Sequence, residues 1–195
     1  MNINPYRFTG QGLLHLHDYS TGIGGLGIRK EEALPLLEAN QRQMSLLQDR
    51  LYAENKESVL IIFQAMDAAG KDSAIKHVIS GMNPQGVTVH NFKQPCTEEL
   101  NHDYLWRAFC HLPARGCIGI FNRSYYEDVL VVKVPGLHKN SNLPERCLTG
   151  TLFEDRYKQI TDFERYLYQN GTRIVKIFLH LSKNEQKNRF LKRID

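Results

Sequence analysis

The stretch of sequence that decides the fold is residues 59–73, VLIIFQAMDAAGKDS. It opens with Val59–Gln64, a run that is apolar at all but its last position. Such a run is typical of a strand that is buried on both faces, as in a parallel sheet. A glycine-containing loop follows, and then a segment that favours a helix from about Lys71 to Ser80. A strand, a glycine loop and a helix in this order are the setting of a phosphate-binding loop, or P-loop.

The loop between this strand and helix predicts a site for phosphate. Backbone N–H groups of such a loop and of the helix N-terminus point into one concavity and attract phosphate oxygens. Gly70 permits close approach of the backbone, and Lys71 can reach the phosphate that is transferred. The phosphate-binding residues predicted here are Ala68, Ala69, Gly70, Lys71, Asp72 and Ser73.

The loop departs from the usual P-loop pattern at two positions. Ala65 stands where the first glycine is usual, and Asp72 replaces the Ser or Thr after the lysine. The hydroxyl that normally contacts magnesium would then come from Ser73 or be absent. Asp67 adds a carboxylate that repels phosphate unless a cation lies between them, so we assign Asp67 to Mg²⁺, directly or through water. On the pattern alone, the alternative is an ordinary strand–turn–helix joint with a capping glycine.

Strands and helices alternate outward from this loop. Apolar or alternating runs predict further strands at residues 87–92, 117–121 and 173–179. Helices are expected at residues 97–112, at 144–169 with a break near 149–151, and at 184–195. The alternation predicts a three-layer α/β/α fold with a parallel sheet. Residues 1–29 are expected to form an irregular arm, and residues 30–195 the P-loop phosphotransferase domain.

A helix before the first strand is expected to begin near Pro35, a residue suited to the first helical turn. Its apolar stripe consists of Leu37, Met44, Leu47 and Leu51. Two interpretations stay open. The helix packs on its own sheet, or it forms a dimer with Asn40 as a polar position inside the stripe.

Composition restricts the class of protein. The chain has 195 residues, is 42% hydrophobic and carries a formal net charge of +4, which suits a globular domain and does not by itself indicate nucleic acid. Its four cysteines form no Cys-x-x-Cys pair, which makes a zinc site unexpected. No run approaches the roughly 20 apolar residues of a membrane helix. The N-terminus also lacks the pattern of a secretory signal. We therefore expect a cytoplasmic protein with no membrane or nucleic-acid partner.

The end of the third predicted strand supplies further candidates. Ligands bind at the carboxyl ends of parallel strands, and Asn122 and Arg123 follow Phe121 at such an end. Asn122 stands where a metal-orienting acid is usual, and the fork of Arg123 suits phosphate. Glu127 lies four residues beyond Arg123. The alternatives are a surface ion pair between Arg123 and Glu127, or, for Glu127, favourable charge in the first turn of a helix.

Three more cations are candidates from their positions. Lys93 follows the second strand at the same sheet edge and could contact an acceptor nucleotide or an anionic chain. Arg189 and Arg193 lie one turn apart in the last helix and could enter the site from a lid to bind phosphate. The alternative for all three is a solvated surface. Nothing in the sequence stands out as a nucleophile–base triad, and transfer onto an anionic phosphate oxygen needs cations and alignment instead.

Several segments in this order closely resemble the polyphosphate kinase 2 family. They are residues 65–72 (AMDAAGKD), 82–87 (MNPQGV), 92–95 (FKQP) and 119–130 (GIFNRSYYEDVL). The resemblance implies a thymidylate-kinase-like P-loop fold, Mg²⁺, and reversible phosphoryl transfer between inorganic polyphosphate and ADP or AMP, forming ATP or ADP. It places Asp67 and Lys71 in the Walker A loop, with Asn122 and Arg123 at the Walker B position.

The resemblance carries further expectations. Glu127 resembles the subgroup that accepts both AMP and ADP, and the family suggests a homo-oligomer, a dimer or a tetramer. Family members continue past the equivalent of Asp195 into a cation-rich lid helix and a further sheet element, so a missing lid is expected to impair closure. The alternatives are an ATP-dependent nucleoside or nucleotide kinase, and a non-catalytic phosphate-binding module.

Overall fold

The computed structural model describes residues 3–22, 29–131 and 143–194, and its centre is one sheet of parallel strands. The strands are β1 (Ser58–Ala65), β2 (Val87–Asn91), β3 (Ile118–Asn122) and β4 (Thr172–Leu179), in the order β2-β3-β1-β4. All three strand pairs are parallel, so the carboxyl ends of β1, β2 and β3 meet at one edge of the sheet. The predicted α/β fold with a parallel sheet is confirmed.

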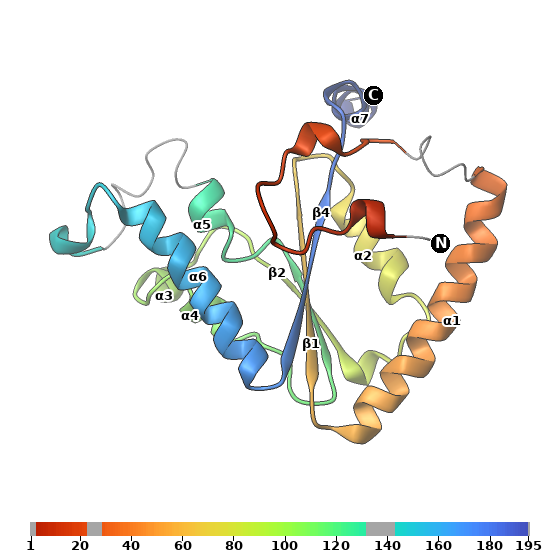
Figure 1. Cartoon of the computed structure of the whole chain (residues 1–195), viewed down its shortest axis with the longest axis horizontal. Coiled ribbons are helices and arrows are strands. Elements are labelled where there is room, and N and C mark those ends of the chain that lie inside the picture. Colours follow the sequence, from red (N-terminus) through yellow and green to blue (C-terminus); the bar gives the residue numbers. More distant parts are fainter. Residues whose placement is uncertain (1–2, 23–28, 132–142, 195) are drawn as a thin grey trace.

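Helices cover both faces of this sheet (Figure 1). On one side lie α1 (Lys30–Glu54) and α2 (Lys71–Ile79). On the other lie α3 (Thr97–Leu100), α4 (Trp106–Phe109), α5 (Glu127–Leu130) and α6 (Leu152–Gln169). The last helix, α7 (Lys183–Ile194), follows the carboxyl end of β4. Short 3₁₀ turns occur at Asn4–Tyr6, Leu16–Asp18, Pro84–Gly86 and Glu145–Cys147. These layers form the predicted α/β/α arrangement.

The core follows from the alternation of side chains along β1. Leu60 and Ile62 point to the cluster beneath α5 and α6, whereas Ile61 and Phe63 point to the cluster beneath α2. Each of these four side chains is at most 9% exposed. Full burial of one such side chain stabilises a fold by about 1.5–3 kcal/mol. The apolar run that predicts the buried strand therefore also anchors the loop that follows it.

The first helix begins earlier than the sequence predicts. Helix α1 starts at Lys30 because the Glu32 carboxylate accepts a hydrogen bond from the Arg29 backbone N–H (3.1 Å) and so caps the first turn. Pro35 lies inside the helix. Of the apolar stripe, Leu37, Met44 and Leu51 are partly buried, whereas Leu47 is 60% exposed. The side chain of Gln48 is buried instead, and its amide group bonds to the N–H and C=O of Asn83 at 2.8 Å each.

The predicted helix over residues 97–112 is wrong as a single element. It divides into α3 and α4, because the side chain of Asp103 accepts a hydrogen bond from Leu105 N–H (2.9 Å) and starts a new turn there. The predicted helix over 144–169 is an α-helix only from Leu152, where α6 begins, and a 3₁₀ turn at Glu145–Cys147 stands before the predicted break near residues 149–151. Of the expected arm, residues 3–22 carry the two 3₁₀ turns at Asn4–Tyr6 and Leu16–Asp18, whereas residues 1–2 and 23–28 lie outside the described residues.

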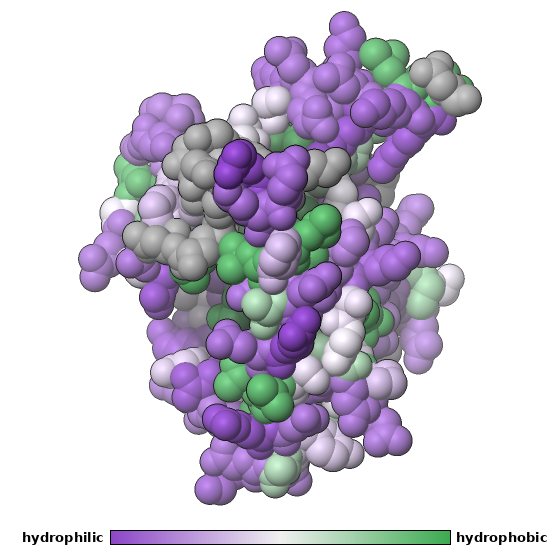
Figure 2. Space-filling view, turned by 90° about the vertical axis from the view of Figure 1, so that its right-hand side faces the viewer, coloured by the Kyte–Doolittle hydropathy of each residue, from purple (hydrophilic) through white to green (hydrophobic). Residues whose placement is uncertain are grey.

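The face that carries α1 is largely hydrophilic, with separate apolar patches (Figure 2). Leu34, Leu46 and Leu47 on this helix are each about 60% exposed. Among the described residues, none of the helices has the length and apolar character to cross a membrane.

Candidate active site

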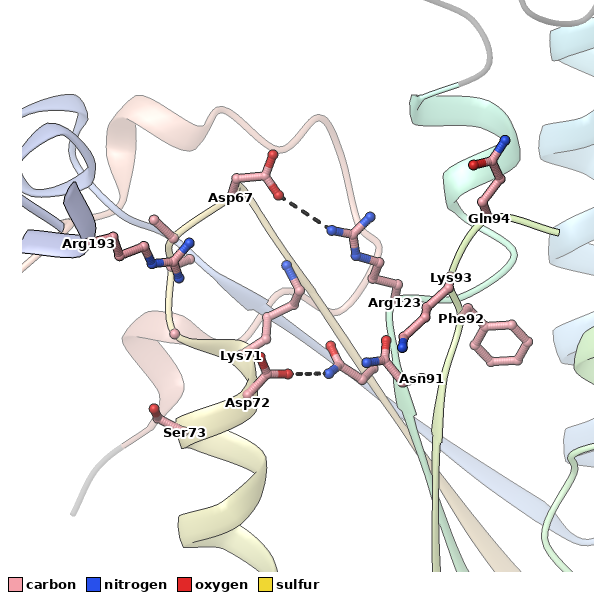
Figure 3. A pocket seen from close by; sticks show the side chains of 14 residues that line it. Asp67, Lys71, Asp72, Ser73, Asn91, Phe92, Lys93, Gln94, Arg123 and Arg193 are labelled. Carbon is pink, nitrogen blue, oxygen red and sulfur yellow. Dashed lines mark hydrogen bonds and ion pairs between the residues drawn. The ribbon is translucent and has the colours of Figure 1, made fainter. Parts of the chain in front are cut away.

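A cavity of about 450 Å³ opens at the carboxyl edge of the sheet, between the P-loop and the ends of β2 and β3 (Figure 3). Ligands of parallel α/β proteins bind at this edge because the strand ends and helix N-termini converge there. The cavity is lined by Asp67, Ala68, Ala69, Gly70, Lys71, Asp72, Ser73, Asn91, Phe92, Lys93, Gln94, Asn122, Arg123 and Arg193.

The P-loop owes its shape to two left-handed residues. Gly70 caps α2 at φ 88°, a conformation that glycine adopts without steric cost. Ala68 adopts φ 63° although it has a β-carbon, which costs roughly 1–2 kcal/mol. Ala69 N–H donates to Met66 O (3.2 Å) and closes the turn, and Lys71 Nζ donates to Ala65 O (3.2 Å) across the loop. Backbone strain of this kind is typical of a ligand-binding loop.

Lys71 carries its charge in a partly buried place. Burial lowers the pKa of its ammonium group, and the Arg123 guanidinium lowers it further. The carboxylates of Asp67, Glu127 and Asp72 oppose this by raising the pKa. A poorly solvated ammonium group with a second cation nearby gains most from a bound anion, so the electrostatics of the loop favour phosphate.

Arg123 stands between two carboxylates. Its backbone is left-handed (φ 66°), and its N–H donates to Phe63 O at 3.0 Å, which joins the end of β1 to the turn after β3. Its guanidinium lies 3.5 Å from Asp67 Oδ1 and 3.8 Å from Glu127 Oε2. Because these pairs are partly exposed, each contributes little stability and can open for a ligand.

The last helix supplies two arginines with different partners. Arg193 lines the cavity, whereas Arg189 does not. Arg189 Nη1 donates to the carbonyls of Ala68 (3.3 Å) and Ala69 (2.9 Å), and Gln186 Nε2 donates to Asp67 O (2.8 Å). These three bonds hold α7 to the outer side of the P-loop.

The structure thus brings most of the predicted site residues together, with two exceptions. Glu127 and Arg189 do not line the cavity, and each reaches it through a residue that does. The sequence prediction missed Asn91, Phe92 and Gln94. Their position in the sequence could have predicted them, since they flank Lys93 at the end of the second strand.

The carboxylates of the cavity suit a magnesium ion in part. Mg²⁺ is usually held in phosphate sites by one or two carboxylates together with waters and phosphate oxygens. Asp67 and Asp72 both line the cavity, and the Asp67 side chain is 73% exposed and accessible to an ion. The described residues contain no cluster of three potential ligands, so phosphate oxygens and water would complete the coordination.

Comparisons with known proteins agree with this geometry. The profile of the family Polyphosphate kinase 2 matches residues 28–195. The ADP-polyphosphate phosphotransferase of Rhodopseudomonas palustris is 54% identical over 168 residues, covering 85% of this chain and 58% of that relative. The AMP/ADP-polyphosphate phosphotransferase of Meiothermus ruber is 46% identical over 166 residues, with the same two shares.

A solved structure is similar over nearly the whole chain. The crystal structure of polyphosphate kinase 2 from Arthrobacter aurescens TC1 matches with a TM-score of 0.85 and 39% sequence identity, over 95% of this chain and 64% of that one. The present chain thus spans 58% of the length of the two curated relatives. Since the family profile covers residues 28–195 and both sequence and structure match its members, the chain belongs to the polyphosphate kinase 2 family.

Proposed function

We propose that this protein transfers phosphoryl groups reversibly between inorganic polyphosphate and ADP or AMP, with the help of Mg²⁺. The observation that carries the proposal is a cavity in which the P-loop, including Lys71, lies close to Arg123 and Arg193. The names of the two relatives, an ADP-polyphosphate and an AMP/ADP-polyphosphate phosphotransferase, support the same pair of substrates.

The chemistry of the cavity fits transfer from one phosphate to another. The acceptor oxygen of ADP or AMP is already anionic, so no general base is required. The site must instead neutralise charge on the transferring group and align the two phosphates. Lys71 and the loop N–H groups would hold the transferring phosphate, and Arg123 would neutralise the charge that develops. Arg193, from α7, would contact the polyphosphate chain.

We assign the nucleotide to the side of the cavity formed by Lys93 and Asn122. Lys93 follows β2 and Asn122 ends β3, and these strands are neighbours in the sheet. Glu127 acts on this side indirectly, through its ion pair with Arg123 (3.8 Å). The acceptance of both AMP and ADP is supported by the name of the Meiothermus ruber relative, an AMP/ADP-polyphosphate phosphotransferase.

We assign Mg²⁺ to Asp67, with Asp72 as a second carboxylate on the same cavity. The ion supplies positive charge between Asp67 and the bound phosphates, which otherwise repel each other. Asp67 keeps its backbone position through Gln186, which donates to its carbonyl oxygen at 2.8 Å. Removal of magnesium by a chelator is expected to abolish turnover.

We also propose a homo-oligomer in the cytoplasm. Leu34, Leu46 and Leu47 expose apolar surface along α1, which supports contact with a second copy of the chain. All four cysteines are free, as expected in a reducing compartment. Light scattering on the purified protein measures the oligomeric state.

The experiment that tests the function is a luciferase assay for ATP with ADP, Mg²⁺ and long-chain polyphosphate, repeated with AMP. ATP from ADP supports the proposal, and ATP from both nucleotides supports dual acceptance. Turnover of a nucleoside or nucleotide with ATP alone, indifferent to polyphosphate, would make the protein an ordinary kinase. Binding of polyphosphate or nucleotide without turnover would make it a binding module.

A further inference from the structure

Behind the cavity, two hydrogen bonds hold the segment that leaves β2. This segment, residues 93–96, has no helical or strand structure and carries Lys93 and Gln94 on the wall of the cavity. At its start, Arg107 Nη2 donates to Lys93 O (2.9 Å). At its end, the Cys96 N–H donates to Glu99 Oε2 (2.7 Å). The segment is therefore fixed at both ends by side chains from α3 and α4.

The two side chains that hold the segment also bind each other. Arg107 Nε lies 3.1 Å from Glu99 Oε1, and the two side chains are only 12% and 17% exposed. The two oxygens of Glu99 thus divide between Arg107 and Cys96. Lys93, Arg107, Glu99 and Cys96 are thus joined by consecutive contacts that begin and end on the segment, and we call this group of contacts the 93–96 bracket. The contact of Arg107 Nε with Glu99 is an ion pair, since Nε makes no hydrogen bond among the described residues. The bonds from Arg107 Nη2 to Lys93 O and from Cys96 N–H to Glu99 Oε2 each involve one charged group, and such charge-assisted hydrogen bonds are about twice as strong as neutral ones.

The bracket rests on the core of the domain. The Arg107 guanidinium lies over the ring of Phe92, 5.0 Å from its centroid. Phe92 is 3% exposed and packs edge-on against Phe121 of β3, with ring centroids 4.7 Å apart. Arg107 therefore connects the buried core around Phe92 to an irregular segment of the cavity wall. A segment without regular structure holds one position only when such contacts determine it.

We propose that Arg107 and Glu99 are positioning residues for the acceptor nucleotide, acting through the 93–96 segment. The proposal rests on the proposed function, which puts the nucleotide on the Lys93 side. Arg107 touches neither substrate, since its side chain does not line the cavity. It fixes the positions of Lys93 and Gln94. Displacement of the Lys93 ammonium group would lower the affinity for the nucleotide that it contacts. The polyphosphate side, formed by the P-loop and Arg193, keeps its own contacts.

The test compares Arg107→Lys and Glu99→Gln with the wild-type chain. A lysine keeps the charge but has one small head group, which cannot hold both Lys93 O and Glu99 as the planar guanidinium does. Arg115→Lys is the matched control. Arg115 also ties two backbone carbonyls, those of Lys56 and Asn170, but at the amino ends of the strands and away from the cavity.

Calorimetry measures the dissociation constants for ADP and for polyphosphate in each variant. Loss of one charge-assisted contact is expected to weaken ADP binding about tenfold in Arg107→Lys and Glu99→Gln. Polyphosphate binding should stay within about twofold in both variants, and Arg115→Lys should change neither constant. Unchanged ADP binding, absent ADP binding in the wild type, or equal weakening for both ligands overturns the proposal.

Hydrogen exchange adds a readout that needs no ligand. Peptides that contain the Cys96 amide should exchange faster in Arg107→Lys than in the wild type, and at the wild-type rate in Arg115→Lys. Unchanged exchange in Arg107→Lys means that the bracket does not hold the segment, and this also overturns the proposal. A wild-type chain that binds ADP but forms no ATP contradicts the proposed function instead, so the two failures are distinguishable.

Discussion

Asn122 Nδ2 donates a hydrogen bond to Asp72 Oδ1, and this contact joins the end of β3 to the first turn of α2. The bond links two departures from the usual pattern, Asp72 in place of the Ser or Thr after the lysine and Asn122 in place of the metal-orienting acid. A carboxylate on α2 would face another carboxylate if β3 ended in the usual acid. The neutral amide of Asn122 instead donates to Asp72, so the two departures compensate each other.

Asn122→Asp is expected to make activity strongly pH-dependent. It places two carboxylates in contact, and like charges at this distance raise the pKa of one of them. Turnover should fall at alkaline pH, where both are ionised, and recover partly as one is protonated. Asn91→Asp is the control, because it adds a charge to the same cavity without a hydrogen bond to Asp72. A wild-type pH–rate profile for Asn122→Asp would count against the pairing.

Lys71→Ala is expected to lower kcat by two to three orders of magnitude. One preorganised charge contact stabilises a transition state by about 3–4 kcal/mol. Lys76→Ala, in the last turn of the same helix, should keep wild-type turnover because Lys76 is exposed and does not line the cavity. Steady-state rates of both variants check this, and near-normal turnover in Lys71→Ala would remove Lys71 from the mechanism.

Arg189→Ala and Arg193→Ala are expected to fail in different ways. Arg189 holds α7 to the carbonyls of Ala68 and Ala69, so its loss should release the helix and raise hydrogen exchange along residues 183–194. Arg193 lines the cavity, so its loss should weaken polyphosphate binding and leave exchange unchanged. Identical exchange patterns in the two variants would argue against this division of roles.

Asp128 is expected to make the wild-type protein less stable as the pH rises towards neutrality. Burial raises the pKa of its carboxyl from 3.8 to about 6, and Arg156 opposes the shift. The folded state therefore holds this proton more tightly than the unfolded state. The resulting stabilisation is complete below about pH 4 and is lost as the pH passes 6. By linkage, its full size is on the order of 3 kcal/mol.

Asp128→Asn should remove this dependence, since asparagine resembles the protonated acid. Urea unfolding at pH 5 and pH 7.5 measures it, and the variant should gain stability over the wild type mainly at pH 7.5. The control is Asp162→Asn, whose exposed carboxylate pairs with Arg165. If the free energy of unfolding of Asp128→Asn differed from that of the wild type by the same amount at both pH values, this would contradict the raised pKa of Asp128.

The parts of the site that the sequence predicted are those that local pattern determines. Residues 59–73 alone contain the pattern of a buried apolar strand followed by a glycine loop, so the P-loop and its lysine could be predicted from the sequence. Positions at strand ends, such as Asn122 and Lys93, followed from the rule that ligands bind at the carboxyl edge.

What the sequence did not predict depends on contacts between distant segments. Arg189 looks like a lid cation, and only the folded chain shows its guanidinium on the P-loop carbonyls, about 120 residues away in sequence. Arg107 belongs to no recognisable sequence motif, because the positioning role proposed for it depends on its hydrogen bond to a backbone carbonyl 14 residues earlier. The helix over 97–112 was wrong because one side-chain bond of Asp103 overrides its helical pattern.

The central claim is that a phosphoryl group passes from polyphosphate to a nucleotide in the cavity that Lys71 and Arg123 line. The most direct measurement supplies radiolabelled polyphosphate with unlabelled ADP and Mg²⁺, and follows the label into the terminal phosphate of ATP. We predict labelled ATP with the wild-type chain and none above background with Lys71→Ala. Label that stays in polyphosphate with the wild type, or equal labelling with Lys71→Ala, would contradict the claim.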